Sequence, residues 1–177
     1  MRLSEQALSI LNIVCEIRLS VSEMLDEVSP AHIYSRGKFS ESMDFDAFNL
    51  LLEELKGNGL IFFNTYLNGT HGEIKLTLDG FRTYISYNSI SIENSVKKII
   101  DELNKYKKNI EGRNDCYLRI SKENFYYDKN PSEMNRYSDY IIQDLEEKGV
   151  IKCTRTMGQQ GFYNLILLAQ SDNYSFI

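Results

Sequence analysis

Several residue types are scarce in this chain, and each scarcity narrows what the protein can be. Tryptophan is absent and only two prolines occur in 177 residues, which favours a chain made mainly of regular elements. No stretch approaches the roughly 18 consecutive apolar residues of a membrane-spanning helix. The N-terminal residues lack the basic segment, apolar run and cleavage site of a secretory signal. We therefore expect a cytoplasmic protein that has no membrane partner.

Cysteine is also scarce. The three cysteines, Cys15, Cys116 and Cys153, are odd in number, far apart and without CxxC spacing. Cys15 falls in an apolar helical stripe, and Cys153 falls in an expected strand. Buried free thiols are therefore favoured over disulfides or metal ligands, which fits a reducing compartment.

Apolar and aromatic residues are plentiful enough for a folded core, at 42% and 12% of the chain. The length allows one ordinary domain or two small domains of roughly 80 residues each. The formal net charge is −5. An acidic chain can still bind nucleic acid, but its contacts with phosphate then need a local basic surface.

The first half of the chain has the pattern of helices followed by a hairpin. Apolar residues at helical spacing, with Ser4 as a cap, predict the first helix. Ser29-Pro30 is interpreted as the end of the second helix, and Gly57-Asn58-Gly59 as the end of the third. Asn68-Gly69 predicts a hairpin turn. The expected elements are a helix over 4–18, a helix over 21–28, an irregular connection over 29–43, a helix from 44 to the glycine stop, strands over 60–67 and 73–78, and a short helix over 79–85.

A pattern in the first half recurs in the second half at a constant offset of 90. Residues 51–61 (LLEELKGNGLI) align with residues 141–151 (IIQDLEEKGVI), with an apolar residue at every apolar position and an identical closing glycine. A strand over 152–157, a turn over 158–161 and a strand over 162–168 are expected to follow without a change of offset. Internal repetition of this kind predicts two copies of one small fold.

Three helices followed by a two-stranded hairpin is the element order of a winged helix-turn-helix. The segment LLEELKGNGLIFF…GEIKLTLDGFRTYI resembles that superfamily, in which a helix closing at glycine leads directly into the hairpin, or wing. The resemblance implies an α+β fold that is mainly α, with two tandem winged-helix domains, each a helical bundle with a C-terminal wing. We expect domains over 1–88 and 89–177, the second starting with a connecting helix over 91–110 and containing a strand over 116–120.

Patterns typical of a catalytic or metal site are absent. His32 and His71 are not near a Cys, Asp or Glu at ligand spacing and are interpreted as surface histidines. GxSxG, HExxH, GxGxxG and P-loop motifs do not occur. The carboxylate pairs Glu53-Glu54 and Glu146-Glu147 are interpreted as solvated helix faces. We therefore predict no catalytic residue, no cofactor, no metal and no enzymatic activity.

The helix before each expected wing is acidic. Residues 44–56 hold four acidic residues against one lysine, and residues 131–148 hold five against one arginine and one lysine, so each carries a local charge of −3. In a DNA-reading winged helix this element enters the major groove, where its exposed side chains contact phosphates and bases. Acidic side chains are repelled there, which counts against ordinary DNA readout.

Basic residues gather outside these two helices. The second wing and the connecting helix are net positive, and basic and aromatic residues interleave from Arg119 to Tyr137. Two interpretations stay open, namely solvated helix faces beside a tyrosine-rich rim, or a patch that contacts phosphates. The candidate nucleic-acid contacts are Asn135, Arg136, Ser138, Lys148, Lys152, Arg155, Lys105, Lys107 and Lys108.

In broad plan the chain is similar to the kite proteins, the kleisin-interacting tandem winged-helix accessory subunits of SMC-type complexes. The similarity lies in the architecture of the whole chain. It implies an adaptor that binds protein partners in a larger, DNA-associated complex through exposed apolar grooves, with homodimerisation and only weak or indirect DNA contact. The alternative is a DNA-binding transcriptional regulator that uses Asn135, Arg136 and Ser138 together with the second wing.

Overall fold

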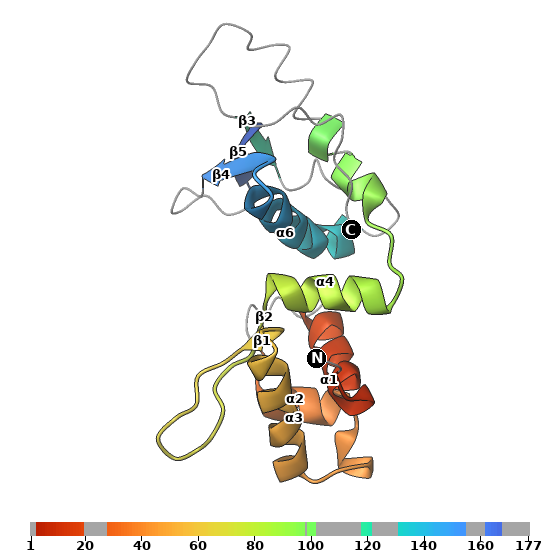
Figure 1. The fold of residues 1–177 in the computed structure, drawn as a ribbon, viewed down its shortest axis with the longest axis vertical. Coiled ribbons are helices and arrows are strands. Elements are labelled where there is room, and N and C mark those ends of the chain that lie inside the picture. Colours follow the sequence, from red (N-terminus) through yellow and green to blue (C-terminus); the bar gives the residue numbers. More distant parts are fainter. Residues whose placement is uncertain are drawn as a thin grey trace, which may run out of the picture. The chain divides into compact units, whose positions relative to one another are not determined.

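The computed structural model divides the chain into two compact units, residues 1–90 and 91–177. The boundary falls just after the one expected between residues 88 and 89. Both units are built mainly from helices, and each has a small antiparallel sheet (Figure 1). The structure describes residues 3–19, 28–97, 99–101, 118–121, 131–154 and 162–167. Side chains are described for residues 3–19, 28–97, 99–101 and 139–152 within those ranges.

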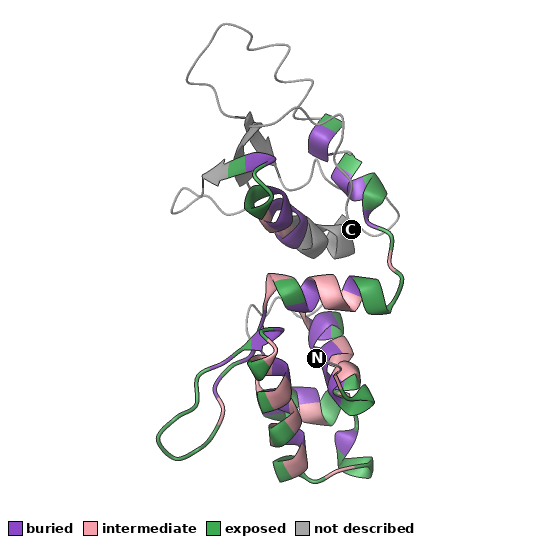
Figure 2. Cartoon of the chain, in the orientation of Figure 1, coloured by how far each residue is buried: buried purple, intermediate pink, exposed green. Residues whose placement is uncertain are grey.

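Unit 1 is a bundle of helices around α1. Its helices are α1 (Glu5–Leu19), α2 (Pro30–Arg36), the short 3-10 helix η1 (Phe39–Glu41), α3 (Phe45–Gly57) and α4 (Leu78–Tyr87). α1 packs against α2, α3 and α4, and its apolar stripe is buried from Ala7 to Leu19 (Figure 2). Phe48, Phe63 and Phe81 are among the largest side chains of this core.

The starts of three of these helices are fixed by side-chain caps. Ser4 Oγ accepts from the amide of Ala7 at 3.2 Å, and Asp44 Oδ1 accepts from Ala47 at 2.8 Å. Thr77 Oγ1 accepts from the amide of Gly80 at 3.0 Å. Each cap satisfies an amide that the helix itself leaves without a partner. The predicted helices from Ser4 and Asp44 are thereby confirmed, with their first turns where the sequence places them.

Ser29-Pro30 begins a helix, a role that the sequence interpretation did not give it. The structure has a helix where an irregular connection was expected, because α2 begins at Pro30. Ser29 is its N-cap and accepts from the amide of His32 at 3.2 Å. Proline suits the first helical position because it has no amide hydrogen to leave unsatisfied. The helix expected over 21–28 lies outside the described residues except for Val28, which is in a β-bridge.

The hairpin of unit 1 is shorter in its pairing than the sequence predicts. Strands β1 (Ile61–Phe62) and β2 (Lys75–Leu76) pair antiparallel, with a further bridge between Thr65 and His71. Val28 pairs with Ile74 through two backbone hydrogen bonds of 3.1 and 2.8 Å. Val28 therefore lies on one side of the second strand of the hairpin, and β1 lies on the other.

Unit 2 repeats this order of pairing. Residues 93–97 and 99–101 are helical, which agrees with the start of the expected connecting helix. The remaining elements are β3 (Leu118–Ser121), α6 (Pro131–Glu147), β4 (Ile151–Thr154) and β5 (Phe162–Leu167). The strand order is β3-β5-β4. β5 therefore lies between β3, which precedes α6, and β4, which follows it, just as the second strand of the hairpin lies between Val28 and β1 in unit 1.

The expectation of an unchanged offset through the second hairpin is wrong by one residue. Ile61 pairs with Leu76 in unit 1, whereas Ile151 pairs with Leu167 in unit 2. The bridge on the other side of the last strand shifts by the same amount, since Val28 pairs with Ile74 and Leu118 pairs with Leu165. The connection between the last two strands is therefore one residue longer in unit 2.

Burial gives the physical reason for this shift. Ile74 and Leu76 point into the core of unit 1. With the longer connection their counterparts are Leu165 and Leu167, whereas an unchanged offset would place Asn164 at the first position. A slip of one residue moves every side chain of a strand to the opposite face, so the apolar alternation selects the longer connection.

Candidate interaction surface

The helix before the hairpin, which is α3 in unit 1 and α6 in unit 2, ends with the same geometry in both units. The amide of Leu60 donates to the carbonyl of Leu55 at 3.0 Å, and the amide of Val150 donates to that of Leu145 at 2.9 Å. The intervening Gly59 and Gly149 have φ of 73° and 68°, in the left-handed region. This closure turns the chain directly from helix into strand. It places the outer face of α3 and of α6 beside the hairpin of the same unit.

The outer stripe of α3 consists of Asp46, Leu50, Glu53 and Gly57. These residues recur every three or four positions and are all exposed, so they form one solvent-facing line along the helix. Leu50 is 73% exposed, which is high for a leucine in the middle of a helix. The line holds two carboxylates and no lysine or arginine.

The one cation of α3 is turned toward the hairpin. The Nζ of Lys56 lies 4.0 Å from Glu53 Oε2 and 4.3 Å from the centre of the Phe63 ring. Its side chain is half-buried between the helix and the hairpin. A cation held over an aromatic ring and beside a carboxylate is poorly placed to reach a phosphate.

The interpretation of His71 as a surface histidine is wrong, because its side chain is largely buried. The hairpin folds back on α3, so that His71 Nε2 lies 3.6 Å from Glu53 Oε1. The imidazole side chain is only 9% exposed and its ring centre lies 4.5 Å from that of Phe63. Its Nδ1 is buried and has no hydrogen-bond partner in the described part of the chain. His32, in contrast, is exposed as expected.

Glu54, which the sequence places on a solvated helix face, is instead half-buried and hydrogen-bonded. Glu54 accepts from the amide and the hydroxyl of Ser4, at 2.9 and 3.1 Å, and so joins the end of α3 to the start of α1. Its counterpart in unit 2, Asp144, is fully buried, and Lys148 Nζ lies 3.0 Å from its Oδ2. Neither carboxylate belongs to the outer surface that a groove-binding helix would present. Glu146 and Glu147 are exposed, as expected.

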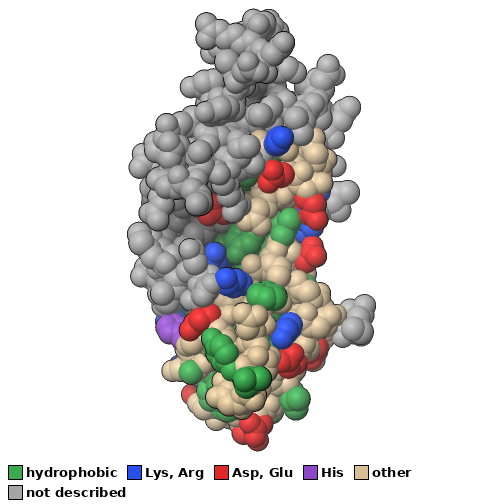
Figure 3. Space-filling model, turned by 90° about the vertical axis from the view of Figure 1, so that its left-hand side faces the viewer, with side chains coloured by type: hydrophobic (Ala, Val, Ile, Leu, Met, Phe, Trp, Pro, Cys, Tyr) green, Lys and Arg blue, Asp and Glu red, His purple; other side chains and the backbone are tan. Residues whose placement is uncertain are grey.

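The hairpin of unit 1 adds three exposed apolar side chains, those of Phe62, Tyr66 and Leu67. Phe62 lies on β1, whereas Tyr66 and Leu67 lie in the turn, where the Tyr66 amide donates to the Thr70 carbonyl at 2.8 Å. Most of the loop is exposed (Figure 2). Figure 3, seen from the side on which this loop projects in Figure 1, shows hydrophobic side chains among acidic and basic ones.

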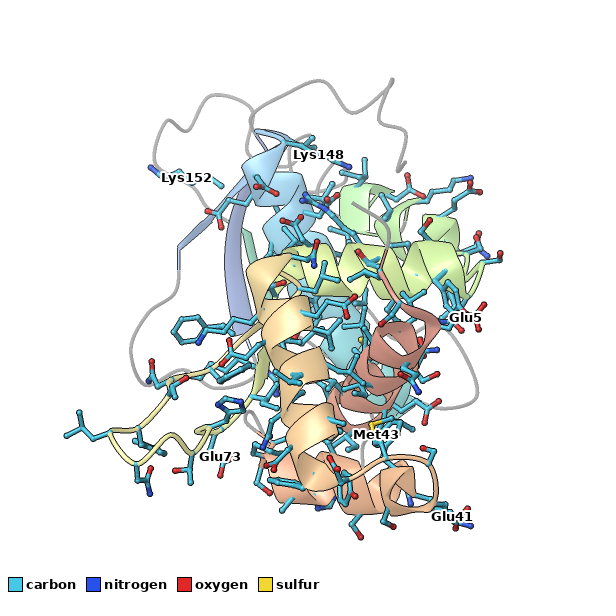
Figure 4. All side chains as sticks on the ribbon, turned by 60° about the horizontal axis from the view of Figure 1, so that its bottom comes forward. Glu5, Glu41, Met43, Glu73, Lys148 and Lys152 are labelled. Atoms are coloured by element: carbon cyan, nitrogen blue, oxygen red, sulfur yellow. The ribbon has the colours of Figure 1, made fainter. Side chains whose placement is uncertain are left out.

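The candidate nucleic-acid contacts are only partly covered by the structure. Asn135, Arg136 and Ser138 lie in α6, but their side chains are outside the described residues. Lys152 is exposed on β4 and points away from the strand (Figure 4). The side chain of Lys148 is 34% exposed and paired with Asp144. The remaining candidates, Arg155, Lys105, Lys107 and Lys108, lie outside the described residues.

A groove of about 510 Å³ in unit 1 has a lining of mixed polar and apolar residues. It lies between the start of α1, the end of α3 and α4, and is lined by Leu3, Glu5, Leu8, Asn58, Leu60, Thr83 and Tyr87. Glu5 is the one charged residue of this lining, so the groove does not bring together an acid and a base. Such a set of groups is what general acid–base catalysis requires.

Cys15 is a buried free thiol, as the sequence predicts. Burial, with a smaller effect of Glu16, raises the pKa of the Cys15 thiol well above its usual value, which disfavours the reactive thiolate. Among the described residues, no three His, Cys, Asp or Glu side chains are grouped as metal ligands would be. In the same part of the chain, none of the helices has both the length and the apolar character required to cross a membrane. Comparison of the chain with protein-family models, with curated proteins and with solved structures gives no match.

Proposed function

We propose that the chain is a non-catalytic tandem winged-helix adaptor, an accessory subunit that mediates protein–protein contacts in a larger, DNA-associated complex. In this proposal the two units are copies of one fold, similar in plan to those of the kite proteins. A DNA-reading winged helix contacts DNA with the helix before the hairpin and with the hairpin itself. In this chain we propose that the same elements, α3 and α6 with the hairpins that follow them, bind protein.

The order of pairing in the two sheets supports the tandem arrangement. In both units a helix is followed by a strand or bridge, at Val28 in unit 1 and β3 in unit 2. The chain then passes through α3 or α6 into the two strands of the hairpin. The last strand is central in each sheet. Two segments that share a helix ending and a strand order are expected from a duplicated fold.

The observation that carries the choice of protein over DNA is the outer stripe of α3. Its exposed charges, Asp46 and Glu53, are both negative, and Lys56 is held against the hairpin. In a major groove these carboxylates would face phosphates that carry about one negative charge per 1.7 Å of duplex. The exposed leucine between them gains nothing from a phosphate backbone but is buried favourably by a protein.

The alternative function, a DNA-binding regulator, would use unit 2. Lys152 is exposed on β4 and provides a cation where unit 1 has Phe62, its counterpart on β1. Arg136 on α6 and Arg155 after β4 would complete the phosphate contacts. This alternative requires a strong dependence of DNA affinity on salt, because each phosphate contact releases counterions.

Binding to a duplex over a range of salt concentrations separates the two functions. For the adaptor, we expect little retention of the full chain on duplex DNA or heparin, and a slope of log affinity against log salt close to zero. Arg136→Glu combined with Lys152→Glu and Arg155→Glu should leave this weak binding unchanged. The measurement is fluorescence anisotropy of a labelled duplex.

Lys38→Glu, which changes an exposed cation of unit 1, is the matched control. A slope equivalent to several phosphates, at about −0.9 per phosphate, would contradict the adaptor function if the triple variant abolished it and the control did not. That result would establish unit 2 as a DNA-binding domain.

A further inference from the structure

We propose that the outer stripe of α3 is a docking site for a basic amphipathic helix of a protein partner. In this arrangement an apolar side chain of the partner covers Leu50, while lysines or arginines on either side of it meet Asp46 and Glu53. This inference rests on the proposed adaptor function and deepens it by naming the surface and the chemistry of the partner.

The apolar part of the site is Leu50. It is exposed in the middle of a well-formed helix and lies opposite Phe48, Leu52 and Leu55, which fill the core of unit 1. Its exposure is therefore not a consequence of a frayed helix end. At Gly57, the last position of the stripe, a Cβ would meet only open space. A partner helix can approach closely at a position without a side chain.

The charges of the site define the spacing of the partner's cations. Asp46 and Glu53 are seven residues apart on one face, which is two helical turns and about 10 Å along the axis. Basic residues seven positions apart on a partner helix have the same separation. An apolar residue between them would then lie over Leu50, as in helix-in-groove recognition.

The carboxylate of Glu53 is held in place before a partner arrives. Lys56 contacts it from the same helix at 4.0 Å, and His71 contacts it from the hairpin at 3.6 Å. These two neighbours restrict the carboxylate, which lowers the conformational entropy lost on docking relative to a free surface glutamate. Lys56 offsets part of the negative charge there, so Asp46 contributes the less compensated charge.

Other classes of ligand fit this surface less well. A nucleic acid or an anionic membrane would be repelled by Asp46 and Glu53. A small cation would gain nothing from Leu50. A cationic and apolar protein helix is the one class that satisfies both kinds of side chain on the stripe.

The test is binding of a synthetic helical peptide of about 18 residues, or five turns, that carries leucines on one face with lysines seven positions apart. A second peptide has glutamate in place of each lysine. Fluorescence anisotropy with the full chain at low salt should show binding of the basic peptide only. Leu50→Ala should weaken it by about tenfold or more, and Asp46→Asn combined with Glu53→Gln should weaken it by a similar factor.

The control variants change matched side chains elsewhere on unit 1. Tyr87→Ala removes an exposed aromatic side chain from the end of α4, and Glu16→Gln combined with Glu41→Gln removes two exposed carboxylates. Each control should change peptide affinity by less than about twofold, because surface residues far from a contact contribute little. Thermal unfolding by circular dichroism checks that every variant is folded.

Equal losses in the stripe variants and in the controls would overturn the docking site, because they would indicate general attraction of a basic peptide to an acidic chain. Binding of the acidic peptide as strongly as the basic one would also overturn it. Neither result affects the adaptor function, which is tested separately by DNA binding. A duplex whose affinity falls in the stripe variants would overturn both proposals.

Discussion

Two glycines of unit 1 differ in what a side chain would meet. Gly80, in the first turn of α4, lies so close to the turn between α3 and β1 that an added Cβ would collide with the carbonyl oxygen of Leu60. Gly57, in the last turn of α3, faces open space. The first glycine is therefore required by packing, and the second is not.

We predict opposite effects of alanine at these two positions. Gly80→Ala should lower the free energy of unfolding by about 2 kcal/mol or more, because the neighbouring atom is backbone and cannot move without shifting α4. Gly57→Ala should raise it by up to about 1 kcal/mol through helix propensity. Urea denaturation of the two variants measures both changes. Equal effects of the two substitutions would contradict the packing of α4 on the turn between α3 and β1.

Single residues also mark the limit of what the sequence predicts. The burial of Cys15 follows from its place in an apolar stripe. The contact between His71 and Glu53 does not, because it depends on how far the hairpin folds back on α3. Leu50 could have been recognised as exposed, since it lies off the face defined by Phe48, Leu52 and Leu55. The docking surface that we propose around it could not be inferred without the positions of Lys56 and the hairpin.

At the scale of elements, the junction between α3 and β1 and the junction between α6 and β4 have the same backbone geometry. Both junctions place glycine in the left-handed region, and both make the same three backbone hydrogen bonds one after another. A residue with a Cβ pays about 1 kcal/mol or more in that conformation. The identical glycines of the aligned segments are explained by this geometry.

The two junctions should respond alike to substitution. Gly59→Ala and Gly149→Ala should each lower the stability of their own unit by about 1 kcal/mol. Hydrogen exchange monitored by mass spectrometry separates the units, since each substitution should raise exchange in its own residues. The matched control is Gly57→Ala, because Gly57 lies in α3 and has an ordinary helical φ. This substitution should not raise exchange. A loss at Gly59 with no loss at Gly149 would contradict the equivalence of the two junctions.

Element types were predictable where a periodic pattern and a cap agree, as for α1 and α3. The errors have local causes. A Ser-Pro pair can follow the end of one helix or form the start of the next. The hydrogen bond from the His32 amide to Ser29 Oγ shows that Ser29-Pro30 starts a helix. The extra residue of the second connection was missed because alignment of the helix ends does not fix the register of the last strand.

At the scale of the whole molecule, the two units have the same order of strand pairing but expose different side chains. Unit 1 presents carboxylates and a leucine on α3, and apolar side chains on its hairpin. Unit 2 presents Lys152 where unit 1 has Phe62. A duplicated fold with divergent surfaces is suited to joining partners of different chemistry.

The central claim is that the chain functions through a protein partner bound at α3, and the mass of its native assembly tests this most directly. The chain is purified from its own cells with nuclease treatment, and the assembly is measured by size exclusion with light scattering beside the Leu50→Ala, Glu53→Gln double variant. We predict one protein partner at fixed stoichiometry that survives nuclease and is lost in the double variant. A chain that elutes alone after nuclease treatment, and associates only with duplex DNA, would contradict the account.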